Sequence, residues 1–273
     1  MEKSPMGPCP RCRRHVLAAE RTCPFCGLTR REVLIAVGAL LVTADTSRAQ
    51  EQAKYGGARP TPDWAAWNHA LAHWRVTVGL SPAVKSWSEH KVGTSVAYSV
   101  TIKRGADAAR KSSVQATLDA VAADSVTLRV EADGAKPFPQ QFQLKAGVPK
   151  EFKVTDLGKE ELAVDGKKFN CDVKSYDGNG IAFKVWHCAD APSGLVKVVQ
   201  GGETTAIEKL DVQLTAAGKA RPCTIWVTTS GATEVREWQS KDVPGLMVKR
   251  VETVKDAAGA VISVTTVEAT AIK

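Results

Sequence analysis

From Val92 onward, runs of the chain carry apolar residues at every second position, the period at which a β-strand turns its side chains to one side. The clearest runs are Val92-Thr94-Val96-Tyr98-Val100, Val126-Leu128-Val130 and Phe142-Leu144, each read at alternate positions. Dipeptides that favour tight turns separate the Val- and Thr-rich runs: Asp133-Gly134, Asp165-Gly166, Asp177-Gly178, Asn179-Gly180 and Gly201-Gly202. The pattern predicts a mainly β domain over residues 81–273, in which consecutive strands pair antiparallel.

Residues 165–216 and 217–268 form an internal repeat with a period of 52 residues. The two copies align without a gap and share the pattern Trp-x-x-x-Asp-x-Pro followed by Val-Lys. The principal matches are Cys171 with Cys223, Trp186 with Trp238, Pro192 with Pro244, and Lys197 with Lys249. We interpret each copy as a strand ending in Trp, a tight turn at Pro and a returning strand, with the Lys on an edge strand. Two copies are too few for a solenoid, so we expect one continuous sheet.

Over about residues 85–270 the chain resembles a group of uncharacterised bacterial envelope proteins. The resemblance is carried by Trp87, Lys91-Val92-Gly93-Thr94, Val164-Asp165-Gly166-Lys167-Lys168-Phe169-x-Cys171, Trp186 and Pro192-Ser193-Gly194-Leu195-Val196-Lys197. More loosely, such proteins look like the LolA/LolB lipoprotein carriers. The resemblance implies a curved, half-barrel-like antiparallel sheet wrapped round a helix, with an apolar groove for a ligand. It carries over no catalytic residue, because function does not follow from fold.

Residues 50–80 are expected to form a linker and one short N-terminal helix. The stretch 50–62 is polar and contains Gly56-Gly57, Pro60 and Pro62. Asp63 can cap a helix that continues to about Trp74, because its apolar residues fall at helical spacing on one face.

The charge balance gives no case for nucleic acid as a partner of the β domain. The chain has 37 basic and 29 acidic residues, and 8 basic and 4 acidic residues precede position 50. The remaining 29 against 25 leave a mild excess of +4 over a long chain.

Two Cys-x-x-Cys pairs near the N-terminus, Cys9 with Cys12 and Cys23 with Cys26, have the spacing of a structural zinc site. Each pair can turn two thiolates toward one point, and together they fill the tetrahedral shell of one zinc ion. A segment this short cannot bury a core, so metal binding would supply its folding energy. Residues 1–28 therefore resemble the zinc-ribbon heads of many bacterial proteins; redox-active dithiols are the alternative.

Residues 29–49 have the layout of an export signal. The apolar run 33–42, extending to residue 44 if Thr43 is tolerated, is shorter than the roughly 20 residues of a membrane span and fits a signal peptide. Thr29-Arg30-Arg31-Glu32-Val33-Leu34 resembles the twin-arginine (Tat) motif, although Val33 stands where Phe is usual, which keeps ordinary Sec export open. Ser47 and Ala49 place small residues where signal peptidase would cleave.

These two segments imply opposite compartments. Cleavage near Ala49 would discard the zinc ribbon and release the β domain to the periplasm or the medium, with the export machinery as its partner. Without cleavage, residues 33–44 would anchor the chain in the membrane with the head in the cytoplasm.

Three further cysteines, Cys171, Cys188 and Cys223, would meet an oxidising compartment after export. A two-residue turn at 179–180 would place Cys171 opposite Cys188 and allow a disulfide. The apolar pattern instead favours pairing the Phe169–Val173 stretch with Ile181–Val185 and sends Cys188 to the other face. The sequence therefore leaves the disulfide open, with the apolar pattern against it, and we expect Cys223 to be a buried apolar residue.

No enzyme motif stands out: the chain lacks Gly-x-Ser-x-Gly, a Walker loop and His-Glu-x-x-His. The leading hypothesis is an exported, non-catalytic, β-rich envelope protein that binds an apolar ligand or a protein partner, with no cofactor in the body. The alternative is a membrane-tethered sensor or adaptor with a cytoplasmic zinc ribbon. A weaker alternative is a secreted hydrolase.

Overall fold

The computed structural model describes residues 6–8, 15–17, 82–133, 136–144, 152–178 and 181–273. The chain divides into two compact units, Met1–Gly57 and Ala58–Lys273. In the first unit, β1 (Met6–Pro8) pairs antiparallel with β2 (His15–Leu17). The other described elements all belong to the second unit.

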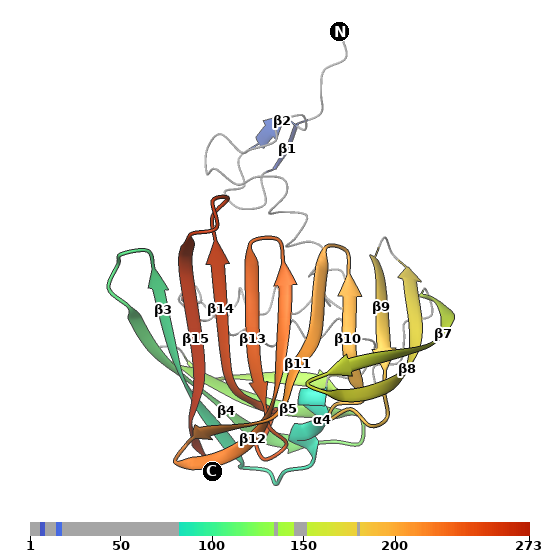
Figure 1. Ribbon diagram of the computed structural model, residues 1–273. Coiled ribbons are helices and arrows are strands. Elements are labelled where there is room, and N and C mark those ends of the chain that lie inside the picture. The colour runs from blue at the N-terminus through green and yellow to red at the C-terminus, as the bar shows by residue number, and fades with distance from the viewer. Residues whose placement is uncertain (1–5, 9–14, 18–81, 134–135, 145–151, 179–180) are drawn as a thin grey trace. The chain divides into compact units, whose positions relative to one another are not determined.

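The second unit contains one antiparallel sheet of 13 strands and, among its described residues, one short helix (Figure 1). The helix is α4 (Pro82–Ser88). The strands are β3 (Ser95–Arg104), β4 (Arg110–Val121), β5 (Ser125–Ala132), β6 (Phe138–Gln143), β7 (Lys153–Val164), β8 (Lys167–Gly178), β9 (Ile181–His187), β10 (Leu195–Gln200), β11 (Glu203–Ala216), β12 (Lys219–Ser230), β13 (Thr233–Gln239), β14 (Met247–Lys255) and β15 (Val261–Ile272). The expectation of a mainly β fold with a single antiparallel sheet is confirmed.

The strand order is β6-β5-β4-β3-β15-β14-β13-β12-β11-β10-β9-β8-β7. Strands that are consecutive in the chain pair with each other, except that β6 and β7 lie at the two opposite edges of the sheet. The first and last strands of the sheet domain, β3 and β15, pair with each other inside the sheet, as the fourth and fifth strands from the β6 edge.

This topology forces the sheet to curve. Strands lie about 4.8 Å apart, so 13 flat strands would separate β6 from β7 by roughly 58 Å. The chain from Gln143 to Lys153 advances ten residues, which reach roughly 36 Å at most when fully extended. The two edges must therefore curl toward each other, yet no ladder joins them, and the sheet stays open as the half-barrel expectation requires.

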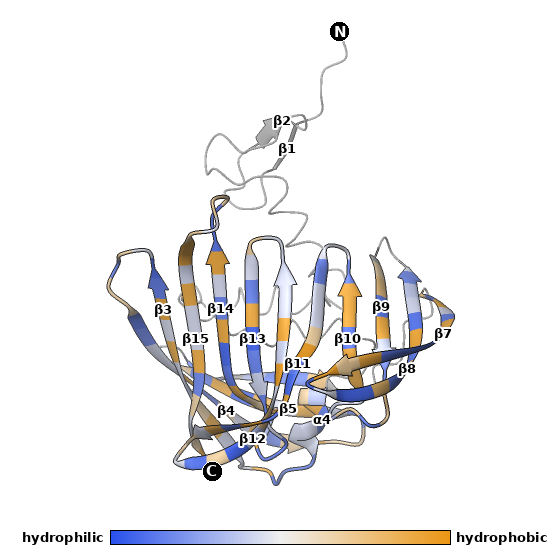
Figure 2. Cartoon of the chain, in the orientation of Figure 1, coloured by the Kyte–Doolittle hydropathy of each residue, from blue (hydrophilic) through white to orange (hydrophobic). Residues whose placement is uncertain are grey.

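Alternating burial along the strands builds the core, and apolar and polar bands follow one another along each strand in Figure 2. In β3, Val96, Tyr98 and Val100 are buried while the residues between them are more exposed. One apolar cluster gathers around β3, β4 and β5, and a second around β8, β9 and β10.

The helix α4 begins at a proline, which is favoured in the first turn because its missing N–H has no intrahelical partner there. Val84 and Trp87, three residues apart, both pack against the first apolar cluster. The sequence analysis placed a helix at 63–74 instead, and those residues lie outside the described ranges. In the part of the chain that the structure describes, no helix is long and apolar enough to cross a membrane.

The strands follow the 52-residue period of the sequence. Strands β8 and β12 begin and end 52 residues apart, and so do β9 and β13. The preceding turns also match, because Asp165 and Ala217 both have positive φ, of 50° and 51°.

Candidate functional site

The register of the strands sorts the side chains onto two faces, because residues directly opposite one another across a ladder point to the same side. One face carries the row Val100, Val267, Arg250, Glu237 and Trp226. We call it the Tyr98 face, since Tyr98 lies two residues from Val100 on the same strand. The other, which carries Trp186 and Trp238, we call the Trp238 face.

A cluster of buried polar side chains lies at the centre of the Tyr98 face. Arg250 and Glu237, on adjacent strands and directly opposite each other, are only 3% and 6% exposed. Arg250 Nη1 lies 3.6 Å from Glu237 Oε2, and Nη2 lies 3.2 Å from Glu252 Oε2. Gln239 Nε2 donates a 2.7 Å hydrogen bond to Glu237 Oε1. One guanidinium thus bridges two carboxylates, one on the neighbouring strand and one on its own strand.

Tyr98 borders this cluster. Its hydroxyl donates a 3.3 Å hydrogen bond to the carbonyl oxygen of Met247. Burial raises the pKa of Tyr98, and the negative charge of Glu237 raises it further. Burial also raises the pKa of Glu203, while Arg250 acts in the opposite direction. The tyrosine therefore stays a neutral hydrogen-bond donor at physiological pH.

The guanidinium is engaged by two carboxylates, and burying charges of this kind carries a desolvation cost that the ion pairs offset. Within the described ranges, no group of three His, Cys, Asp or Glu side chains could hold a metal ion.

Apolar side chains flank the cluster on both sides of the same face. Toward β6 the face is lined by Val96, Val114, Leu118, Val126, Leu128 and Val130, all at most 2% exposed. Toward β7 it carries Tyr176, Phe183, Val185, Val198 and Ile207, and the rings of Tyr176 and Phe183 stack with centroids 4.8 Å apart. The face combines two apolar walls with one charged centre.

The predicted repeat residues lie on the Trp238 face and at its turns. Trp186 is buried and donates a 2.9 Å hydrogen bond from Nε1 to Glu160 Oε2. Lys184 and Lys197 lie 4.4 and 4.9 Å from the centroid of its ring.

In the second copy, Lys249 lies 5.9 Å from the ring centroid of Trp238 and forms an ion pair of 3.7 Å with Glu268. Pro192 is exposed, whereas Pro244 is buried. The expectation that the repeated lysines occupy edge strands is wrong: β10 and β14 each pair on both sides. The lysine ammonium groups lie over the indole rings, a cation–π arrangement.

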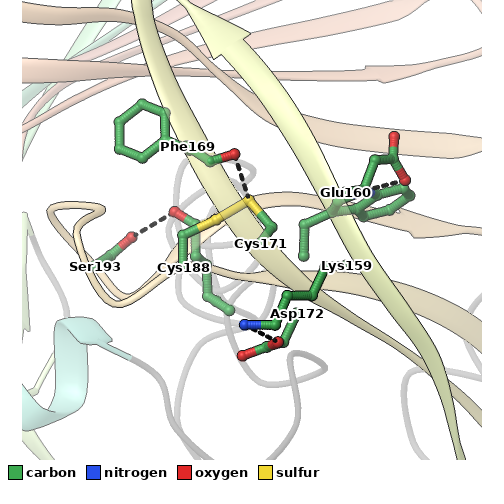
Figure 3. The surroundings of a disulfide bond; sticks show 9 residues. Lys159, Glu160, Phe169, Cys171, Asp172, Cys188 and Ser193 are labelled. Carbon is green, nitrogen blue, oxygen red and sulfur yellow. Dashed lines mark hydrogen bonds and ion pairs between the residues drawn. A yellow bond between two sulfur atoms is a disulfide. The ribbon is translucent and has the colours of Figure 1, made fainter.

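Cys171 and Cys188 form the disulfide that a two-residue turn at 179–180 allows and that the apolar pattern disfavoured (Figure 3). Gly178 pairs with Ile181, so only two residues separate the strands, and Asp172 is opposite His187. Cys171 and Cys188 are the next pair, with Cα atoms 4.6 Å apart, the spacing of directly opposed residues.

The apolar pattern misled because β8 and β9 bury side chains on both faces. Val173 faces Trp186 on one side of the sheet, and Tyr176 faces Phe183 on the other. Alternation specifies register only where a single face is buried. Cys223 is a buried free thiol, as expected.

The proposed zinc ligands Cys9, Cys12, Cys23 and Cys26 lie outside the described residues, as do Arg30, Arg31 and Ala49 of the proposed signal. The structure leaves these predictions as they stood.

Sequence reasoning missed the Arg250–Glu237 pair. The sequence does hold a signal for it. Arg250 lies two residues after Val248 and Glu237 two residues after Val235, so each charged residue occupies a position whose side chain points to the buried face. Charged residues at such positions on two consecutive strands indicate an internal ion pair, but only if the register between those strands is known.

No protein-family model matches the chain, and no curated protein matches it. Among solved structures the chain is similar to a LolA superfamily protein from Nitrosomonas europaea, with 9% identity and a TM-score of 0.31 over 72% of this chain and 94% of that one. It is also similar to MucB, with 10% identity and a TM-score of 0.28 over 70% and 56% of the two chains. A DUF1329 family protein from Desulfovibrio piger gives 12% identity and a TM-score of 0.23 over 71% and 90%. Likenesses this weak establish no shared function.

Proposed function

We propose that this chain is an exported, non-catalytic, β-rich protein of the bacterial cell envelope, which holds an apolar ligand on the Tyr98 face. The observation that carries the export is the disulfide between Cys171 and Cys188, both at most 2% exposed. Disulfides form and persist in oxidising compartments such as the periplasm and are rare in the cytosol. The signal-like segment at residues 29–49 supports the same compartment independently.

The ligand class follows from the lining of the Tyr98 face. The side chains of its two apolar walls are buried in this structure, so a hydrocarbon ligand would replace the protein groups that now cover them, while the cluster around Arg250 would supply the few polar groups that fix orientation in such sites. A protein segment of similar apolar character is the alternative occupant, and the experiment below distinguishes the two.

The compartment is tested by the intact mass and the N-terminal residue of the protein recovered from its native cell, fraction by fraction. We expect a chain that starts at Gln50, found in the periplasm or the medium. A full-length chain in the membrane fraction that carries one zinc ion would instead support the membrane-tethered adaptor, in which the four N-terminal cysteines stay part of the protein. A full-length cytosolic chain with reduced Cys171 and Cys188 would refute export.

The ligand is tested by native mass spectrometry of the protein purified without detergent, followed by solvent extraction and analysis of the extract. We expect a small apolar molecule bound to each chain and released by solvent. A matched pair of variants locates it: Val198→Ser alters the Tyr98 face, and Val199→Ser makes the same change one residue along β10 on the opposite face. Occupancy should fall in the first variant alone. Co-purification of a polypeptide in place of a small molecule would assign the face to a protein partner.

A further inference from the structure

Two neighbouring hairpins place an apolar pair beside basic side chains at one end of the sheet. Val261 and Ile262, at the start of β15, are 51% and 46% exposed. The basic residues are Lys103 and Arg104 at the end of β3, Arg110 and Lys111 at the start of β4, and Lys255 at the end of β14, all exposed. We call this set the basic hairpin end.

The register brings these residues together. Arg104 is opposite Ser263, Lys255 is opposite Val261, and the amide of Gly105 donates a 3.0 Å hydrogen bond to the carbonyl of Ile262. Arg110 is opposite Ile102, and Lys111 is next to it. The apolar pair thus lies between Lys255 on one side and the β3–β4 basic residues on the other.

None of the five basic side chains forms an ion pair with a described residue. The two turns contain only two acidic residues against five basic ones, a net charge of +3 over 103–111 and 255–262. One of these acids, Asp256, accepts hydrogen bonds of 2.9 Å from the amides of Ala258 and Ala260 and so closes its own turn. The remaining turn residues are alanine and glycine.

We propose that the basic hairpin end docks onto an anionic lipid surface, with Val261 and Ile262 entering the headgroup region. Exposed apolar residues ringed by Lys and Arg are the signature of peripheral membrane binding. The turn between β14 and β15 projects beyond the neighbouring turns in Figure 1, and the apolar pair follows directly after it at the start of β15. Two exposed side chains are far less than the roughly 800 Å² per partner of a stable protein interface, whereas shallow insertion among lipid headgroups needs only a small apolar area. This surface is distinct from the Tyr98 face, and its test does not depend on the ligand proposed there.

The test is co-sedimentation of the full chain with vesicles of phosphatidylcholine alone or with 30% phosphatidylglycerol. The first variant combines Lys103→Gln, Arg104→Gln, Arg110→Gln and Lys111→Gln. Each basic side chain near an anionic surface contributes about a fivefold gain in binding, so we expect at least a tenfold loss on anionic vesicles. The wild type should also lose most of its anionic preference at high salt, because screening shortens the range of the charges. A second variant, Val261→Ser with Ile262→Ser, should lower binding about fivefold or more by removing the inserted apolar surface.

The matched control removes four exposed lysines away from this end of the sheet, Lys91, Lys209, Lys219 and Lys241, none of which forms an ion pair with a described residue. It has the same net charge as the first variant, and residues 1–49 are common to all variants, so a difference between the two isolates the basic hairpin end. Equal binding of the four-charge variant and the control would overturn the proposal. So would equal binding of the wild type to both kinds of vesicle. Tighter binding to poly-glutamate than to anionic vesicles would assign the surface to an acidic protein and would equally overturn it.

Discussion

The second copy of the repeat keeps only one of the two cysteines that form the disulfide in the first copy. Adding 52 to Cys171 and Cys188 gives Cys223 and Ser240, both buried. In the first copy Asp172 is opposite His187, and in the second Thr224 is opposite Gln239, so both cysteine positions follow the same register. We therefore predict that Ser240→Cys forms a disulfide with Cys223 without a rearrangement of the backbone.

The loops after these positions carry the same hydrogen bonds. The amide of Cys188 donates to the carbonyl of Gly194 at 3.0 Å, and the amide of Ser240 donates to Leu246 at 2.8 Å. Gly194 and Leu246 also share a positive φ, of 73° and 65°. The backbone that holds Cys188 in place therefore recurs around Ser240.

The expected stabilisation follows from the length of the closed loop. The native bridge spans a sequence separation of 17, and positions 223 and 240 have the same separation. Closing a loop of this length removes about 3 kcal/mol of chain entropy from the unfolded state. The hydrogen bond from the amide of Asp242 to Ser240 Oγ is lost, at a cost of about 1 kcal/mol. The net gain of about 2 kcal/mol corresponds to a rise in Tm of about 4–8 °C for a domain of this size.

The assay is non-reducing tryptic mapping of the full chain, in which peptide 220–236 should appear joined to peptide 237–241. Thermal unfolding with and without reductant then measures the gain. Lys241→Cys is the matched control, because it places a thiol one exposed residue further along, out of register with Cys223. Absence of the 223–240 link in a folded variant, or a link equally frequent in the control, would refute the argument from register.

Three further predictions follow from single contacts. Gly245→Ala should destabilise the domain by about 2–4 kcal/mol in urea unfolding, because φ is +76° and the new Cβ would lie 2.5 Å from Trp87 Nε1. Arg250→Ala should cost about 3–5 kcal/mol in the same assay, because it leaves the buried carboxylate of Glu237 without its cation. Burial, and next the positive charge of Lys174, lowers the pKa of His187 from its usual 6.5. As the pH falls, the imidazole is therefore protonated in the unfolded state before it is protonated in the folded state. The free energy of unfolding should decrease as the pH drops below about 6.5.

Each of these has its own control. Gly259→Ala has a similar positive φ of +86° but open space around the new Cβ, so it should cost only about 1 kcal/mol of backbone strain. Replacing Arg250 and Glu237 together with methionine should be much milder than Arg250→Ala, because both charges leave. The variant His187→Gln should lose the decline in stability below pH 6.5; an unchanged decline would show that another group titrates.

The strands were predictable from residues 92 onward because their alternation is local, and so was the burial of Cys223. The helix α4 was missed because its seven residues are too few to establish a helical period. The partner of Cys171 was misjudged because the argument assumed one buried face, whereas the structure buries Tyr176 and Val173 on opposite sides of β8.

By itself, the sequence determined the mainly β character and the antiparallel meander, because both follow from apolar spacing and turn residues within a few positions. It also determined the 52-residue period, because the two copies can be aligned directly. Only the tertiary structure decided that β3 and β15 pair inside the sheet, that Arg250 lies opposite Glu237 and that Ile262 adjoins the β3–β4 hairpin. These contacts join residues that are far apart along the chain or depend on a single register, and a shift of one residue would send every side chain to the opposite face.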